Sequence, residues 1–99
     1  MSAVLSLPAP QTLAAFCRDH GVRKLRLFGS AVRDDFDPGK SDIDLLVEYL
    51  PGKHAGLAHF ALAEELSMIF GRKVDLNTPA MLGRYLQKAE KEARTLYPL

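Results

Sequence analysis

The sequence contains little cysteine, no tryptophan and no marked excess of either charge. Cys17 is the only cysteine among the 99 residues, so a disulfide within the chain is excluded and a reducing, intracellular setting fits. The 13 Lys and Arg residues against 12 Asp and Glu residues give a formal net charge of +1. Proteins that bind nucleic acid through its phosphates usually carry a clear basic excess, so direct nucleic-acid binding is not expected.

Long apolar runs are also absent. No stretch approaches the roughly 20 apolar residues that a membrane-spanning helix needs. The N-terminal stretch has no basic residue ahead of its short apolar run, and Pro8 and Pro10 interrupt that run, so it does not resemble a signal peptide. We therefore expect a cytoplasmic protein with no membrane contact.

What the sequence does contain is typical of one small globular domain. Apolar residues make up 47% of the chain and charged residues 25%. The length suits a single domain, expected to span residues 1–99, and no repeat, low-complexity tract or linker divides it. Cys17 falls among apolar residues in a helical pattern, so we expect it in the core rather than as a nucleophile.

Helical and strand-like patterns alternate along the chain in the order αβαβαβα. Helices are expected at about 10–20, briefly at 30–33, at 57–70 and at 78–96, and strands at 24–28, 43–48 and 74–76. The strand–helix–strand crossover between the second and third strands favours a parallel pair. The shorter link between the first two strands leaves an antiparallel pair open. We therefore predict an α/β (α+β) domain, with helices packed on a small mixed sheet of about three strands.

Asp42 and Asp44 stand two residues apart at the start of the second expected strand. Side chains alternate along a strand, so both carboxylates point to one side while Ile43 and Leu45 point to the other. Neighbouring carboxylates repel each other unless a cation lies between them, and Mg²⁺ prefers such oxygen ligands together with substrate phosphates. A solvated acidic loop is the alternative, because further acids precede this pair.

Asp75 lies in the third expected strand, which should run beside the second. If the two strands are adjacent, it completes a cluster of three carboxylates, and two metal ions about 3.5–4 Å apart can then promote displacement at phosphorus. Asp75 could also accept the proton of the attacking group. The alternative is an exposed residue paired with Arg72 or Lys73.

Gly29 and Ser30 follow the first expected strand. Glycine permits a tight turn and a close approach of the backbone to a ligand. Backbone N–H groups at the start of a helix, together with a serine hydroxyl, can bind an anion. Taken alone, the dipeptide also fits an ordinary turn.

Together these residues resemble the signature of the DNA polymerase β-like nucleotidyltransferase superfamily, G-S-x-x-R followed by S-D-x-D-L. The matching segments are residues 28–33 (FGSAVR) and 41–47 (SDIDLLV), and residues 74–76 (VDL) resemble the third acidic strand of its minimal nucleotidyltransferase (MNT) branch. The resemblance covers about Val22 to Leu86, most of the chain.

The resemblance implies a nucleotidyltransferase fold with a site for ATP and two Mg²⁺ ions. Asp42, Asp44 and Asp75 would be catalytic residues and metal ligands, the first two for both ions and the third for the catalytic ion. Gly29 and Ser30 would bind the β- and γ-phosphates.

Two further residues belong to the same nucleotide-binding signature. Ser41 precedes the acidic pair, and Arg33 would face the phosphates or a partner protein. For Arg33, a structural salt bridge with Asp34, Asp35 or Asp37 stays open as the alternative.

Minimal nucleotidyltransferases often act as antitoxins beside a HEPN-type ribonuclease toxin, and active members transfer AMP from ATP to a toxin tyrosine. The resemblance therefore implies a Mg²⁺-dependent protein adenylyltransferase, an MntA-type antitoxin that forms a hetero-oligomer with its toxin. Two alternatives stay open. The domain could neutralise a toxin by occlusion without catalysis, or it could modify a small hydroxylated molecule, although such enzymes generally need additional domain mass.

Overall fold

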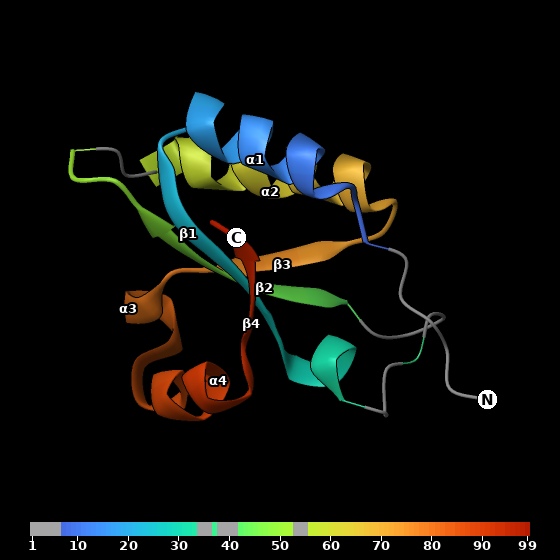
Figure 1. The fold of residues 1–99 in the computed structure, drawn as a ribbon. Helices are drawn as coiled ribbons and strands as arrows, with labels where there is room; N and C mark the ends of the chain where they lie inside the picture. Colours follow the sequence, from blue (N-terminus) through green and yellow to red (C-terminus); the bar gives the residue numbers. More distant parts are fainter. Residues whose placement is uncertain (1–6, 34–36, 38–41, 53–55) are drawn as a thin grey trace.

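Four strands form one mixed sheet that separates two layers of helix (Figure 1). The strands are β1 (Val22–Phe28), β2 (Ile43–Tyr49), β3 (Val74–Asn77) and β4 (Arg94–Tyr97), in the sheet order β3-β2-β1-β4. One layer consists of α1 (Pro10–Asp19) and α2 (Gly56–Phe70), and the other of α3 (Pro79–Leu82) and α4 (Leu86–Glu92). Two 3₁₀ helices, η1 (Gly29–Val32) and η2 (Gly83–Tyr85), complete the order. This computed structural model describes residues 7–33, 37, 42–52 and 56–99.

The sheet is mixed because β2 pairs antiparallel with β1 and parallel with β3. Leu27 lies opposite Leu45 in the first pair, and Asp44 lies beside Asp75 in the second. α2 forms the crossover between the two parallel strands. The predicted α/β class and the parallel pairing of β2 with β3 are therefore confirmed. The pairing of β1 with β2, which the sequence left open, is antiparallel.

The face of the sheet under α1 and α2 holds the apolar core. Alternate residues of β2 point into it, and Ile43, Leu45 and Val47 are each at most 1% exposed. α2 adds a stripe at helical spacing that contains Leu62, Leu66 and Phe70. Burying one aliphatic side chain of this kind contributes about 1.5–3 kcal/mol, so this face supplies most of the driving force for folding.

Cys17 of α1 lies in this core, as predicted. Its side chain is fully buried, and burial raises the pKa of the thiol to about 11. A thiol that stays protonated at neutral pH is a poor nucleophile, so the residue serves packing.

The segment after Thr78 differs from the predicted single helix that runs to about Leu96. Thr78 and Pro79 do begin a helix, and the Thr78 hydroxyl oxygen accepts a hydrogen bond from Met81 N at 3.3 Å. Gly83 then takes a φ of 54°, a conformation outside the right-handed helical region, so α3 ends after one turn.

The C-terminal part of the predicted helix is a fourth strand instead. α4 ends at Glu92, and Ala93 is extended with a ψ of 143°. β4 then pairs antiparallel with β1, where Arg94 lies opposite Leu27. The apolar residue Leu96 fits the buried side of either a helix or a strand. Residues 94–97 form a strand because they pair with the otherwise free edge of β1. In the part of the chain that the structure describes, the sheet has four strands rather than about three.

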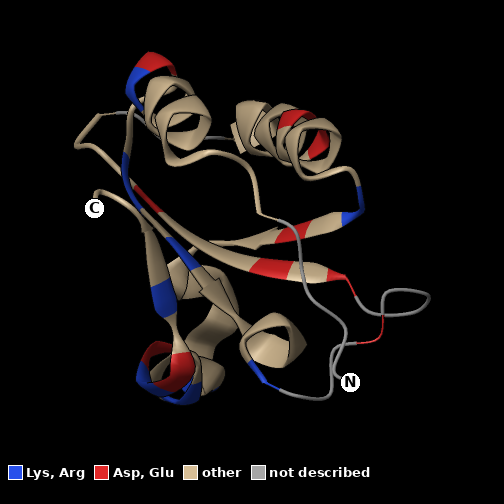
Figure 2. Cartoon of the chain, turned by 45° about the vertical axis from the view of Figure 1, so that its right-hand side comes forward, with Lys and Arg blue, Asp and Glu red and all other residues tan. Residues whose placement is uncertain are grey.

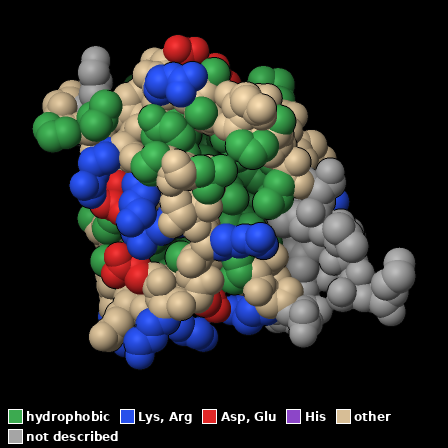
Figure 3. Space-filling model, in the orientation of Figure 1, with side chains coloured by type: hydrophobic (Ala, Val, Ile, Leu, Met, Phe, Trp, Pro, Cys, Tyr) green, Lys and Arg blue, Asp and Glu red, His purple; other side chains and the backbone are tan. Residues whose placement is uncertain are grey.

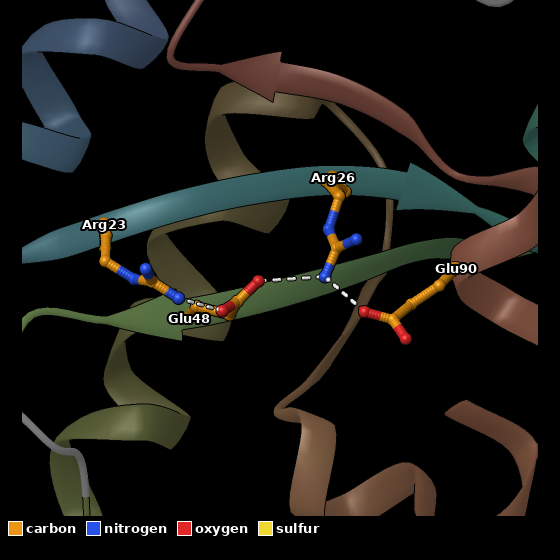
Figure 4. A network of polar contacts seen from close by, with 4 residues as sticks. All are labelled: Arg23, Arg26, Glu48 and Glu90. Atoms are coloured by element: carbon orange, nitrogen blue, oxygen red, sulfur yellow. Dashed lines mark hydrogen bonds and ion pairs between the residues drawn. The ribbon is translucent and has the colours of Figure 1, made fainter. Parts of the chain in front are cut away.

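The face of the sheet opposite the core carries charge. Arg26 in β1 is 8% exposed, and its Nη2 donates to Glu48 of β2 at 2.9 Å and to Glu90 of α4 at 3.3 Å (Figure 4). Glu48 also accepts a hydrogen bond from Arg23. A buried guanidinium is tolerated when carboxylates surround it, so this network joins two strands and α4 by charge rather than by apolar packing.

An apolar groove runs between α1 and the edge strand β4, where hydrophobic side chains gather in Figure 3. Its lining includes Leu7, Pro10, Leu13, Leu96 and Leu99. Despite this apolar surface, none of the helices in the described ranges has the length and hydrophobicity to cross a bilayer.

Candidate active site

The three predicted acids lie on the charged face of the sheet, near the start of two neighbouring strands. Asp44 in β2 and Asp75 in β3 are register partners in the parallel pair, and Asp42 directly precedes β2. The red segments of these two strands lie side by side in Figure 2. Register partners point to the same side of a sheet, so the carboxylates of Asp44 and Asp75 meet there.

The carboxyl group of Asp44 resists ionisation. Burial is the largest cause, followed by the negative charges of Asp75 and Asp42 and a side-chain hydrogen bond with Asp75, and together these raise its pKa to about 6. The positive charge of Arg33 acts in the opposite direction. A proton or a cation relieves the repulsion between these acids, so the cluster has the electrostatics of a cation site.

The donor set fits Mg²⁺ by its chemistry, because carboxylate oxygens are the protein ligands that this ion prefers. Asp44 and Asp75 share a hydrogen bond when one of the two carboxyl groups is protonated. The side chain of Asp42 is 42% exposed, and its Oδ2 lies 3.8 Å from Lys73 Nζ. Lys73, one of the two basic residues considered as a partner for Asp75, therefore lies near Asp42. In the described part of the chain, no three His, Cys, Asp or Glu side chains are grouped closely enough to hold an ion. Asp44 and Asp75 are therefore the preformed part of the site.

Gly29 lies directly against Asp44. Its φ of 74° is in the left-handed region, and a Cβ at this position would lie 2.3 Å from Asp44 Oδ2. Only glycine allows the backbone to approach the carboxylate so closely. Ser30 follows in η1 and is half-buried, so the Gly–Ser turn and the acid pair share one site.

Glu92, at the end of α4, is a member of the site that the sequence analysis did not find. Its Oε1 accepts hydrogen bonds from Gly29 N at 3.0 Å and from Arg33 Nη1 at 3.2 Å, and its Oε2 accepts from Arg33 Nη1 at 2.9 Å. The residue follows Gly29 by 63 positions. No motif or spacing signal spans that separation, so only the folded chain brings the two together.

Arg33 was expected to face phosphates or a partner, or to pair with Asp34, Asp35 or Asp37. The structure gives its guanidinium an ion pair with Glu92 while its side chain stays 44% exposed. Asp34 and Asp35 lie outside the described residues.

Ser41, the remaining predicted nucleotide-binding residue, also lies outside the described residues.

A groove of about 200 Å³ opens beside Gly29 and Arg33. Its opposite wall comes from α3, η2 and α4 and consists of Leu82, Tyr85, Lys88, Ala89 and Glu92. Tyr85 is 59% exposed, and Lys88 adds a second cation beside Arg33. The Gly–Ser turn is thus bordered by the acid pair on one side and by this partly basic groove on the other.

The fold and the acidic site define a nucleotidyltransferase domain. Residues 10–97, nearly the whole chain, match the family model of the nucleotidyltransferase domain, so the chain belongs to this family. A minimal nucleotidyltransferase of known structure is 30% identical to it, with a TM-score of 0.71 and coverage of 91% of this chain and 88% of the other. No curated protein is significantly similar to the chain in sequence.

Toxin–antitoxin structures share the same fold. A chain of a toxin–antitoxin structure with AMP-PNP is 22% identical, with a TM-score of 0.72 and coverage of 91% of this chain and 73% of that one. A chain of the complex between a tri-AMPylated Shewanella oneidensis HEPN toxin and its MNT antitoxin is 20% identical, with a TM-score of 0.65 and coverage of 91% and 70%. At these identities the likeness establishes the architecture.

Proposed function

We propose that the chain transfers AMP from ATP to a hydroxyl group of a partner protein in a Mg²⁺-dependent reaction. The observation that carries this proposal is the carboxylate pair of Asp44 and Asp75 packed against the Gly29 turn. Carboxylates that repel each other beside a glycine turn suit a site for a divalent cation and a polyphosphate, as the family implies.

The reaction forms a bond between the acceptor oxygen and the α-phosphorus of ATP. The bond from that phosphorus to the oxygen bridging to the β-phosphate breaks, and pyrophosphate leaves. Asp75 is exposed at the site and is the candidate acceptor for the hydroxyl proton. A Mg²⁺ ion held by these carboxylates would supply neutralisation of phosphate charge and a lower pKa of the attacking hydroxyl.

The other residues of the site bind and orient the substrate. Asp42, Asp44 and Asp75 would hold the divalent ions, and the turn at Gly29 and Ser30 would receive the β- and γ-phosphates. Ser41 belongs to the same site by its place in the signature. These assignments rest on the match to the family motif and on the proximity of Asp44, Asp75 and Gly29.

The proposed partner is a HEPN-type toxin, with a tyrosine as acceptor and this chain as its antitoxin in the cytoplasm. The support is the likeness to chains from toxin–antitoxin structures, one of which contains a tri-AMPylated HEPN toxin. Tyr85 and the groove beside Arg33 are exposed next to the site and offer a surface on which an acceptor chain could rest.

A transfer assay tests the proposal. The chain is incubated with ATP labelled at the α-phosphate, Mg²⁺ and the protein that co-purifies with it, and the mass of each protein is measured before and after. We expect the partner to gain one or more AMP units. Asp75→Asn and Asp42→Asn should abolish the gain, whereas Glu64→Gln, an exposed acid on α2, should leave it intact. No transfer by the native chain, or unchanged transfer by Asp42→Asn, would reject the proposal.

The same variants separate catalysis from occlusion. A binding antitoxin would still neutralise its toxin when Asp42 or Asp75 is replaced by asparagine. Rescue of toxin-inhibited growth by both variants, together with an unmodified toxin, would support the binding alternative over the transferase.

A further inference from the structure

One carboxylate holds both ends of the turn that is proposed to receive the phosphates. Glu92 Oε1 accepts from the backbone N–H of Gly29, the first residue of η1, at 3.0 Å. The same side chain pairs with Arg33, which directly follows η1, at 2.9 Å. η1 has no side-chain cap of its own, so among the described contacts Glu92 satisfies its first donor.

The position of Glu92 is itself fixed by the sheet. Two residues later, Arg94 begins β4 and lies opposite Leu27 in β1. The backbone of Glu92 cannot move away from β1 without breaking this pairing. The side chain is only 23% exposed, so it is enclosed as well as tethered.

The opposite side of the turn faces the acid pair. A Cβ on Gly29 would lie 2.3 Å from Asp44 Oδ2, which leaves no spare room between the turn and the carboxylate. Glu92 on one side and Asp44 on the other therefore fix the backbone of Gly29 between them. A shift of the turn by a fraction of an ångström changes the spacing between the phosphate-binding turn and the acids.

We propose that Glu92 is a positioning residue of the transferase site, which clamps the Gly29–Arg33 turn at the distance from Asp44 that transfer requires. This inference rests on the proposed transferase function. In this role Glu92 accepts from the Gly29 N–H and pairs with the Arg33 guanidinium. The hydroxyl and N–H of Ser30 are then the donors of the turn that can bind the phosphates. The competing role for Glu92 is an internal anion that ATP must displace, which would make it inhibitory.

Steady-state kinetics with ATP, Mg²⁺ and the co-purified partner distinguish these roles. Displacement of reacting groups by about 1 Å can lower a rate about 100-fold, so Glu92→Ala should lower kcat/KM by about that factor and raise KM for ATP. Glu92→Gln keeps an oxygen that accepts from Gly29 N–H, so it should recover at least about tenfold of the loss. Glu90→Ala is the matched control, because Glu90 is on the same helix and contacts Arg26 instead.

Each other outcome overturns the proposal. A lower KM for ATP in Glu92→Ala would show an inhibitory anion. Unchanged kcat and KM per folded molecule, with only a lower melting temperature, would show a merely structural contact. Equal losses in Glu92→Ala and Glu92→Gln would show that the hydrogen bond to Gly29 does not matter.

A second measurement separates this inference from the transferase proposal. If the native chain transfers nothing, the proposed function fails, and the clamp is then judged by hydrogen exchange of the Gly29 amide. In Glu92→Ala this amide should exchange at least about tenfold faster than in the native chain, and in Glu90→Ala it should not change. An unchanged Gly29 amide in Glu92→Ala would refute the clamp whatever the activity.

Discussion

The two faces of the sheet have different roles in the protein. The face under α1 and α2 is apolar and closed, and Ile43, Leu45 and Val47 of β2 are buried in it. The face toward α3 and α4 carries Asp44 and Glu48 of the same strand together with Asp75 of β3. Because side chains alternate along a strand, neighbouring residues serve different purposes: one stabilises the fold and the next provides the chemistry.

The chemical face is held together differently from the core. Arg26 is nearly buried there between Glu48 and Glu90, and Glu92 binds Gly29 and Arg33. Ion pairs of this kind offset a desolvation cost and add little net stability, but they fix geometry. Stability and positioning are therefore carried by separate sets of residues, and substitutions on the two faces should affect them separately.

The largest expected effect is on activity, from Asp44→Asn. Loss of this carboxylate removes a proposed metal ligand, and metal-ion stabilisation of several kcal/mol corresponds to a loss of transfer of at least about 1000-fold. The free energy of unfolding in the absence of metal should stay equal or rise, because a carboxyl group destabilised by burial and by Asp75 is removed. Transfer assays and urea unfolding of the same sample check both parts. A marked fall in stability would break the separation of the two faces.

Leu45→Ala tests the neighbouring residue on the other face. Leu45 is 0% exposed, and truncation of such a leucine lowers the free energy of unfolding by about 2–5 kcal/mol. Transfer per folded molecule should fall far less than in Asp44→Asn, because the side chain points away from the site. Urea unfolding gives the stability, and transfer normalised to the folded fraction gives the activity.

Gly29→Ala tests the contact between the turn and the acids. A Cβ would lie 2.3 Å from Asp44 Oδ2, so the turn or the Asp44 carboxylate must shift, and transfer should fall about 100-fold. Gly52→Ala is the matched control, since Gly52 has a similar φ of 79° but, among the residues that the structure describes, no atom within 4 Å of an added Cβ. Both variants carry backbone strain and should lose stability, Gly29→Ala the more because its Cβ also conflicts with Asp44, but only Gly52→Ala should keep its transfer rate. Equal transfer by the two variants would argue against a fixed turn.

The smallest effect is a dependence of stability on pH in the absence of metal. The pKa of Asp44 is raised from 3.8 to about 6 in the folded chain, so between these values the folded state binds more protons than the unfolded state. The free energy of unfolding should therefore fall as pH rises from about 4 to 6. The fall should be only on the order of 1 kcal/mol, because water screens the charge of a half-exposed carboxylate.

Difference measurements isolate this contribution. Urea unfolding of the native chain and of Asp44→Asn at several pH values should show the slope in the native chain and a smaller slope in the variant. Addition of Mg²⁺ at pH 7.5 should stabilise the native chain more than the variant. Parallel slopes in the two proteins would assign the pH dependence to other groups.

Much of the fold could be predicted from short-range patterns. The alternation of Leu25 and Leu27 with charged residues fixed β1, and Gly71 ended the long apolar helix α2. The region after Thr78 could not be predicted in the same way. Its apolar residues at 82, 86, 89, 93 and 96 fit one helical face, but Gly83 breaks the helix and the free edge of β1 takes residues 94–97 as a strand.

The candidate site was predicted in part. The spacing of Asp42 and Asp44 follows from the two-residue period of a strand, and it required no knowledge of the rest of the chain. The proximity of Asp75 depended on one inference about topology, the parallel pairing of the strands on either side of the crossover, which the pairing of β2 with β3 confirms. The unequal placement of the acids, with Asp42 beside Lys73, depended on side-chain packing that no pattern encodes.

By itself the sequence determined that Ile43 and Leu45 face the core, that Asp42 and Asp44 share the other side of the same strand, and that a Gly–Ser turn precedes this acidic strand, because these features depend on neighbours a few positions apart. Only the tertiary structure decided that Glu92 meets Gly29 and Arg33, and that the chain ends its last helix to add a strand beside β1. Contacts between residues 59 or more positions apart are selected by the packing of the whole domain, so local periodicity cannot specify them.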